Sequence, residues 1–185
     1  MIKYIEETHQ YFIDDVEVPS VSKLVSFAMN DDLSNINPEI LKKAAEYGTS
    51  VHEAIEEYER TNTIPFMYEE IISLYNELKS ASGLEIESME QIITDGKNYA
   101  GRYDILAKNG ILYDIKTNSR PMIEKWSWQL SLYYHALKSN QKIGYVIYLP
   151  KKGKHKLIEI PIKDEITINT LLELYHEEHP TSWTR

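Results

Sequence analysis

Apolar and polar residues recur along the chain with two different periods, and the changes of period divide it into elements. In some segments apolar residues occupy every second position, which is typical of half-buried strands. In others they recur every three to four positions, which is typical of helices with one buried face. We predict strands at 2–5, 10–13, 16–18, 84–94, 99–107, 111–116, 142–149 and 155–162, and helices at 20–29, 38–60, 67–82, 121–138 and 164–178.

Capping residues mark the starts of two of these helices. Ser20 and Asn37 each precede a helical segment, and both are good N-caps because their side chains accept hydrogen bonds from the first free amides. Pro38 follows Asn37 and suits the first position of a helix. These signals place two helix starts without reference to the rest of the fold.

The order of the elements indicates an α/β fold. Helices precede three strands, and a helix, two strands and a helix follow, which predicts a mixed central β-sheet flanked by helices, with a small N-terminal hairpin. At 185 residues the chain fits a single domain spanning 1–185, with residues 1–30 as an N-terminal hairpin-and-helix appendage.

Composition limits both the compartment and the chemistry. No apolar run approaches 18 residues and the N-terminus lacks a signal-peptide pattern, so we expect a cytoplasmic protein that does not enter a membrane. The chain has no Cys, which excludes disulfides, thiolate zinc sites and iron–sulfur clusters. A metal ion would therefore have to be bound by His, Asp or Glu.

Charge is distributed unevenly along the chain. The formal net charge is -9, yet residues 125–158 contain no Asp or Glu. The lysines in this segment are Lys125, Lys138, Lys142, Lys151, Lys152, Lys154 and Lys156. They are either ordinary solvated lysines or a basic face for a polyanion. We predict that the turn carrying Lys151, Lys152, Lys154 and Lys156 contacts nucleic-acid phosphates.

The register of the predicted hairpin at 101–117 can be worked out from its loop. A two-residue turn would put Asp104 and Asp114 on opposite faces, whereas a three-residue loop at 108–110 sets them directly opposite each other. The three-residue loop separates the apolar side chains from the charged ones better. It gives one apolar face, Tyr103, Ile105, Ala107, Ile111, Tyr113 and Ile115, and a second face with Arg102, Asp104, Asp114, Lys116, Leu106 and Leu112.

Two opposed carboxylates repel each other unless a cation neutralises them. Oxygen ligands beside a lysine suit Mg²⁺ or Mn²⁺ acting on a phosphate, with Lys116 orienting a water molecule or stabilising developing charge. The alternative is a surface hairpin with an ordinary Asp–Lys ion pair, and the spacing alone leaves both open.

The hairpin resembles the core of the PD-(D/E)XK nuclease superfamily. In its RecB-like branch the motif reads roughly G-x-x-D and then D-x-K-T, and this chain has these residues at 101–104 and 114–117, with Tyr103 where the family usually has Pro. Further matches are the G-T-x-x-H helix at 48–52, Glu90 on the preceding strand and the Q-x-x-x-Y helix at 129–133. The opening residues also resemble the N-terminal hairpin of phage-type members, so the resemblance covers residues 1 to about 137.

The resemblance implies a restriction-endonuclease-like core and a Mg²⁺- or Mn²⁺-dependent deoxyribonuclease, most simply an exonuclease of phage or mobile-element recombination and repair, acting on DNA. It also allows a recombination or single-strand-binding partner protein. The alternatives are a structure-specific endonuclease and a noncatalytic binding or inhibitor protein that kept the fold. Absence of Cys separates the chain from relatives with an iron–sulfur cluster.

The resemblance also assigns roles to residues. It implies His52, Asp104, Asp114 and the main-chain carbonyl of Ile115 as metal ligands, and Lys116 as the catalytic lysine; Glu90, Gln129 and Tyr133 are further expected site residues. Taken alone, a His in this position is more often a packed core residue. Tyr133 could likewise serve only helix packing, and Gln129 could lie in solvent.

Overall fold

The computed structural model describes residues 1–31 and 37–180. Every predicted strand and helix is present, with ends that differ by a few residues. The elements are β1 (Ile2–Ile5), β2 (Gln10–Ile13), β3 (Val16–Val18), α1 (Val21–Met29), α2 (Pro38–Thr61), α3 (Glu69–Ser82), β4 (Ile86–Thr94), β5 (Ala100–Ala107), β6 (Leu112–Lys116), α4 (Ile123–Ala136), β7 (Ile143–Tyr148), β8 (Lys156–Pro161) and α5 (Glu165–Glu178).

The strands form two sheets. The main sheet has the order β4-β5-β6-β7-β8, in which β6 and β7 are parallel and all other neighbours are antiparallel. The second sheet is the small antiparallel unit β1-β2-β3. The predicted α/β class with a mixed sheet and an N-terminal hairpin is confirmed.

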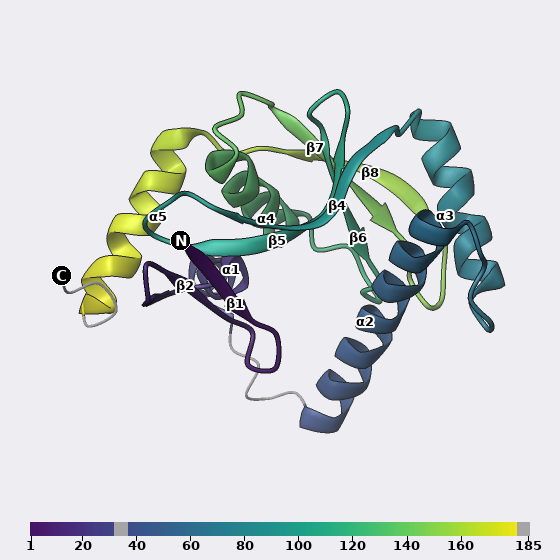
Figure 1. Ribbon diagram of the computed structural model, residues 1–185, viewed down its shortest axis with the longest axis horizontal. Helices are drawn as coiled ribbons and strands as arrows, with labels where there is room; N and C mark the ends of the chain where they lie inside the picture. Colours follow the sequence, from purple (N-terminus) through teal and green to yellow (C-terminus); the bar gives the residue numbers. More distant parts are fainter. Residues whose placement is uncertain (32–36, 181–185) are drawn as a thin grey trace.

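Helices cover the main sheet in two groups (Figure 1). Helices α1, α4 and α5 share one hydrophobic core, which includes Leu24, Trp126 and Leu171, whereas α2 and α3 share another, which includes Ile55 and Tyr75. Within the described ranges, none of the helices is long and apolar enough to cross a membrane. Both predicted N-caps are confirmed, because the Ser20 and Asn37 side chains accept backbone hydrogen bonds at the starts of α1 and α2.

The β5–β6 hairpin adopts the predicted three-residue loop. The Ala107 amide donates to the Ile111 carbonyl at 2.9 Å, and the following pairs of the ladder continue this register. Asp104 and Asp114 therefore lie opposite each other. The apolar face is less uniform than predicted, because Tyr103 packs in the core of α1, α4 and α5, whereas Ile105 packs in that of α2 and α3. A long strand of a twisted sheet meets different helices at its two ends, which strand parity alone does not reveal.

The N-terminal sheet is attached to the main sheet at the start of β5. The Ala100 amide donates to the Pro19 carbonyl at 3.2 Å, and Ser20 forms an isolated parallel bridge with Ala100. Tyr11 and Val18 from the small sheet are buried against Ala100. The first strands are thus held beside the strand that carries Asp104.

Gly101 allows three elements to meet closely. A Cβ atom at this position would lie 2.7 Å from Val21 Cγ2 on α1 and 2.9 Å from Tyr133 Cε1 on α4. We therefore expect Gly101→Ala to destabilise the protein by about 1–3 kcal/mol, since extra atoms in a packed core force neighbours to shift. Urea unfolding measures this change.

Gly48→Ala provides the matched control. A Cβ atom there would meet only Thr117 Oγ1 at 3.4 Å, which is ordinary contact, so Gly48 does not have to be glycine for α2 to approach the sheet. Because alanine is the better helix former, Gly48→Ala should be neutral or stabilising by up to about 1 kcal/mol. Equal stability of the Gly101 variant and the wild type would contradict the close contact.

Candidate active site

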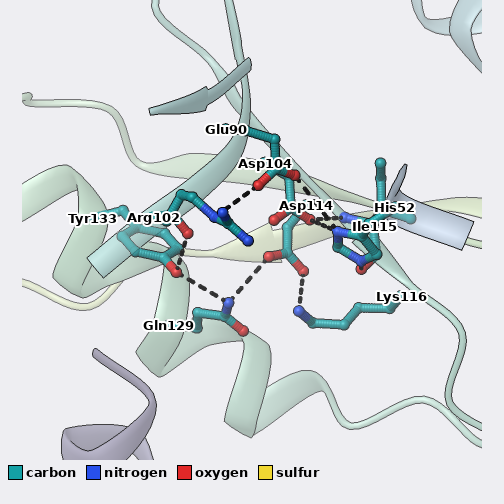
Figure 2. Close-up of polar contacts among 9 residues, drawn as sticks. All are labelled: His52, Glu90, Arg102, Asp104, Asp114, Ile115, Lys116, Gln129 and Tyr133. Atoms are coloured by element: carbon teal, nitrogen blue, oxygen red, sulfur yellow. Dashed lines mark hydrogen bonds and ion pairs between the residues drawn. The ribbon is translucent and has the colours of Figure 1, made fainter. Parts of the chain in front are cut away.

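A small pocket lies where β5 and β6 meet α2, α4 and the N-terminal sheet. Its volume is about 210 Å³, and Asp104 and Lys116 contribute to its walls. Asp104 and Asp114 are nearly inaccessible to solvent, at 7% and 2% relative exposure. Buried carboxylates require compensation, and their neighbours provide it as described below (Figure 2).

Three side chains from three different elements converge at one end of the pocket. His52 of α2 places its Nδ1 atom 3.6 Å from Asp104 Oδ2 and 3.7 Å from Glu90 Oε1. One ligand atom from each of the three residues lies within 4.8 Å of the others. His52, Glu90 and Asp104 therefore form the carboxylate–histidine cluster of this site. His52 is half-buried and its ring lies next to two carboxylates, so it is not packed among apolar residues alone.

Glu90 reaches this cluster through an unusual backbone conformation. Its φ angle is +51°, in the left-handed region that side chains other than glycine seldom adopt, although it lies within β4. The register also shifts between Ile86 and Ser88, so simple alternation along β4 is broken. Arg102 Nε lies 2.9 Å from Glu90 Oε2 and helps to hold the carboxylate in the pocket. Strain of this kind is common at functional sites.

His52 itself offsets part of the negative charge of the cluster. Burial opposes protonation of His52, but Asp104 and Glu90 outweigh it and raise the pKa of the imidazole to about 9. His52 Nε2 lies 3.0 Å from the carbonyl oxygen of Ile115, which can only accept a hydrogen bond. The Nε2–H group is therefore directed at Ile115, and Nδ1 is the ring atom that faces the carboxylates.

Asp114 is held by a second set of contacts. Its Oδ2 atom lies 2.6 Å from Lys116 Nζ, and its Oδ1 atom accepts a hydrogen bond from Gln129 Nε2 at 3.2 Å. Tyr133, one turn beyond Gln129 on α4, donates its hydroxyl to the Arg102 carbonyl at 2.7 Å. Gln129 is thus not simply solvent-exposed, and both α4 residues fix the strands that carry the carboxylates relative to each other.

Burial shapes the ionisation of the Asp114–Lys116 pair. Burial raises the pKa of Asp114 to about 6, against the lowering effect of Lys116. Burial also disfavours the ammonium form of Lys116, but Asp114 and Asp104 raise its pKa above the ordinary value. At neutral pH the pair is therefore a carboxylate and an ammonium ion. The ammonium group is positioned at the pocket with its charge retained.

The donor set fits a hard divalent cation. Two carboxylates and one imidazole converge, and Asp104 also accepts the Ile115 amide at 2.6 Å, which fixes the orientation of one ligand. Asp114 and the Ile115 carbonyl lie beside this cluster, Asp114 in contact with Lys116 and the carbonyl in contact with His52. Oxygen-rich sites of this kind suit Mg²⁺ or Mn²⁺ better than soft metals.

The basic turn lies outside the pocket but at the same end of the sheet. The Leu149 amide donates to the Lys116 carbonyl at 2.7 Å, so the β7–β8 turn starts next to the strand that carries Lys116. Lys151 Nζ lies 5.1 Å from the ring centroid of Tyr47 on α2, while Lys152 and Lys154 are exposed. These lysines do not contact the carboxylate cluster.

The pocket also has aromatic and charged residues that were not among the predicted site residues, namely Tyr4, His9, Tyr11 and Arg102. Arg102 lies two positions before Asp104 and therefore shares its face of β5, which is a signal that parity provides. The three aromatic residues belong to β1, β2 and the loop between them. Their sequence carries no comparable signal, because only the attachment of the small sheet to β5 brings them to the pocket.

Comparison with known proteins relates this chain to others through its fold alone. No protein-family profile and no curated protein sequence matches it. The structure is similar to an alkaline exonuclease (LHK-Exo) from Laribacter hongkongensis, with a TM-score of 0.53 and 12% sequence identity, covering 87% of each chain. It also overlaps the crystal structure of SSO0001, with a TM-score of 0.44 and 24% identity, covering 88% of this chain and 76% of that chain. The likeness to LHK-Exo shows a shared fold.

Proposed function

We propose that this protein is a metal-dependent DNA nuclease that hydrolyses phosphodiester bonds. The observation that carries the proposal is that the His52–Glu90–Asp104 cluster and Lys116 line one pocket, with Lys116 paired to the buried Asp114. The exonuclease-like fold and the resemblance of the sequence motifs to PD-(D/E)XK nucleases support it. Fold alone does not define an activity, so the proposal depends on the chemistry of these side chains.

The proposed roles follow from the contacts of each group. His52, Glu90, Asp104 and Asp114, with the Ile115 carbonyl, would hold Mg²⁺ or Mn²⁺. A divalent cation bound there would neutralise phosphate charge and lower the pKa of an attacking water molecule. Lys116 would hydrogen-bond that water or the phosphate, because its ammonium group is fixed by Asp114 and faces the pocket. Gln129 and Tyr133 would position Asp114 and β5.

The finer role that we propose is exonuclease action in phage or mobile-element recombination and repair, which rests on the resemblance alone. A direct test compares end-labelled linear DNA with closed circular DNA in the presence of Mg²⁺, Mn²⁺ or a chelator. An exonuclease degrades the linear substrate and leaves the covalently closed circle intact. Nicking or linearisation of the circle would instead assign an endonuclease, and degradation of neither substrate would contradict the nuclease proposal.

We further propose that the β7–β8 turn contacts the DNA backbone. It starts beside the Lys116 strand, and its exposed lysines offer local positive charge on a protein whose net charge is -9. At physiological salt such charges act over about 8 Å, so proximity to the pocket is essential. His155 Nε2 lies 3.4 Å from Glu77 Oε2 and so already has an acidic neighbour, which leaves the lysines as the principal candidates.

Replacing Lys151, Lys152 and Lys154 together by Gln is expected to weaken DNA binding to a similar extent for all sequences. The slope of log affinity against log salt should flatten by up to about three units, one for each phosphate that a lysine no longer neutralises. Fluorescence anisotropy at several salt concentrations measures both quantities. Lys108→Gln is the control. Lys108 is exposed in the β5–β6 loop, at the other end of the sheet from the β7–β8 turn, and pairs with Glu85. An unchanged slope in the triple variant would exclude the turn from the interface.

A further inference from the structure

Three aromatic side chains from β1, β2 and the loop between them form one wall of the pocket. Tyr4 and Tyr11 are stacked, with ring centroids 4.7 Å apart and an interplanar angle of 27°. His9 meets the Tyr4 ring edge-on at 6.1 Å. All three line the same pocket as His52, Glu90 and Asp104. We call Tyr4, His9 and Tyr11 the aromatic wall.

The members of the aromatic wall differ in exposure. Tyr11 is only 6% exposed and is packed against Val18 and Ala100, so it anchors the wall to β5. Tyr4 is half-buried, and His9 is exposed. A planar group entering the pocket would therefore meet Tyr4 and His9, while Tyr11 supports Tyr4 from behind.

Arg102 connects the aromatic wall to the carboxylate cluster. Its Nε atom pairs with Glu90 Oε2, and its guanidinium carbon lies 6.0 Å from the centroid of the Tyr4 ring. Within residues 1–31 and 37–180, Glu90 is its only ion-pair partner. The terminal nitrogens of the guanidinium group are thus available to an anion, and a guanidinium fork matches the geometry of a phosphate.

The size of the pocket limits what it encloses. Pockets that enclose a drug-sized ligand have volumes of about 300–1,000 Å³. This pocket has a volume of about 210 Å³, so a phosphate and part of a sugar would lie inside, while the base would remain at the mouth. Of the aromatic wall, the exposed His9 and the half-buried Tyr4 are the members that solvent reaches, and stacking on tyrosine or histidine is a common way of binding unpaired bases.

We propose that the aromatic wall and Arg102 bind an unpaired nucleotide next to the scissile phosphate, with its base stacked on Tyr4 and His9. This inference rests on the proposed nuclease function and adds a substrate class, DNA that is single-stranded or frayed at its end. A base inside a duplex has both faces covered by its neighbours, so it has no free face for Tyr4. Stacking does not depend on base identity, so the preference is for strandedness and not for sequence.

The first test compares variants of Tyr4 in binding a short single-stranded oligonucleotide. Tyr4→Ala should weaken binding about 5- to 100-fold, and Tyr4→Phe should retain most of it, because the ring face is kept. Binding is measured by fluorescence anisotropy in the Lys116→Ala background with Mg²⁺, so that the DNA stays intact. Tyr145→Ala is the control. Tyr145 does not line the pocket, and its ring stacks on that of Tyr113 with 5.3 Å between the centroids.

The second test changes the substrate. In protein that retains Tyr4, an abasic nucleotide next to the cleaved bond should weaken DNA binding. The loss of affinity should be similar to that caused by Tyr4→Ala with the normal substrate. The two changes together should be little worse than either alone, because each removes the same stack. A blunt duplex should bind more weakly than a duplex with a frayed end, and this difference should shrink in Tyr4→Ala. His9→Ala should also weaken binding to the normal substrate more than binding to the abasic one. Because His9 is exposed, this substitution should not disturb folding.

The outcomes separate this inference from the proposed function. Wild-type protein that cleaves no DNA with Mg²⁺ or Mn²⁺ overturns the proposed function. Wild-type protein that cleaves DNA, while Tyr4→Ala, His9→Ala and the abasic substrate change nothing, overturns only the aromatic subsite. Effects of Tyr4→Ala and the abasic nucleotide that simply multiply would also overturn it, since the two groups would then act independently.

Discussion

Replacing Lys116 by Ala is expected to lower the rate of DNA cleavage by at least about 10³-fold, since electrostatic stabilisation of a reacting phosphate by a positioned cation contributes several kcal/mol. Lys116 Nζ is held 2.6 Å from Asp114 Oδ2 and Lys116 lines the pocket, so Lys116→Ala removes a positioned ammonium group from the site. Single-turnover cleavage of end-labelled DNA measures the effect on chemistry separately from product release.

Lys79→Ala is the matched control for the removal of an ion-paired lysine. Lys79 lies 2.6 Å from Glu59 Oε1, with its side chain 27% exposed, but it joins α3 to α2 away from the pocket. It should leave the cleavage rate within about two-fold of wild type. Because Lys116→Ala leaves Asp114 buried without its partner, thermal unfolding must accompany the assay, and Asp114→Asn in the same chain should restore stability but not activity. A folded Lys116→Ala protein that cuts at the wild-type rate would exclude the lysine from catalysis.

Removal of divalent cations is expected to abolish cleavage, and Glu90→Gln is expected to weaken Mn²⁺ binding at least about 10-fold. The second effect follows from the convergence of Glu90 with His52 and Asp104, because the substitution removes a negative charge from a ligand. Isothermal titration of Mn²⁺ into the protein without DNA measures this affinity independently of activity.

Glu87→Gln is the control for this second prediction. Glu87 lies on the same strand but is exposed at the register shift of β4, so its replacement should not change Mn²⁺ affinity. Equal affinities of Glu90→Gln and wild type would remove Glu90 from the metal site and leave Asp104, Asp114 and His52 as its side-chain ligands. Full cleavage in excess chelator would argue against a divalent cation altogether.

The register of the central hairpin was predictable because it depends on local rules. The side-chain period of a strand is two, and the loop length fixes which residues pair, so apolar sorting selects one of two registers. This places Asp104 opposite Asp114 and puts Lys116 on the same face, as the structure confirms through the Ala107–Ile111 hydrogen bond.

The position of Glu90 was less predictable because β4 departs from regular geometry. A register shift near Ile86 and a positive φ angle at Glu90 both alter the direction in which the side chain points. Parity assumes an undistorted strand, so it could not decide whether Glu90 joins the cluster. The ion pair with Arg102 and the approach of His52 are tertiary contacts that keep the carboxylate in place.

By itself the sequence determined the elements, the caps at Ser20 and Asn37, and the strands that carry Asp104, Asp114 and Lys116. Each of these features depends on residues that are close together in the sequence, because the backbone geometry and the periodic burial of a short segment determine it. Tertiary structure alone decided that Glu90 completes the cluster with His52, that Tyr103 packs in the other core, and that Tyr4 faces the pocket. Those outcomes depend on how α2, β4 and the N-terminal sheet pack against β5. Such packing is set by the combined burial of residues far apart in the sequence, and no local pattern encodes it.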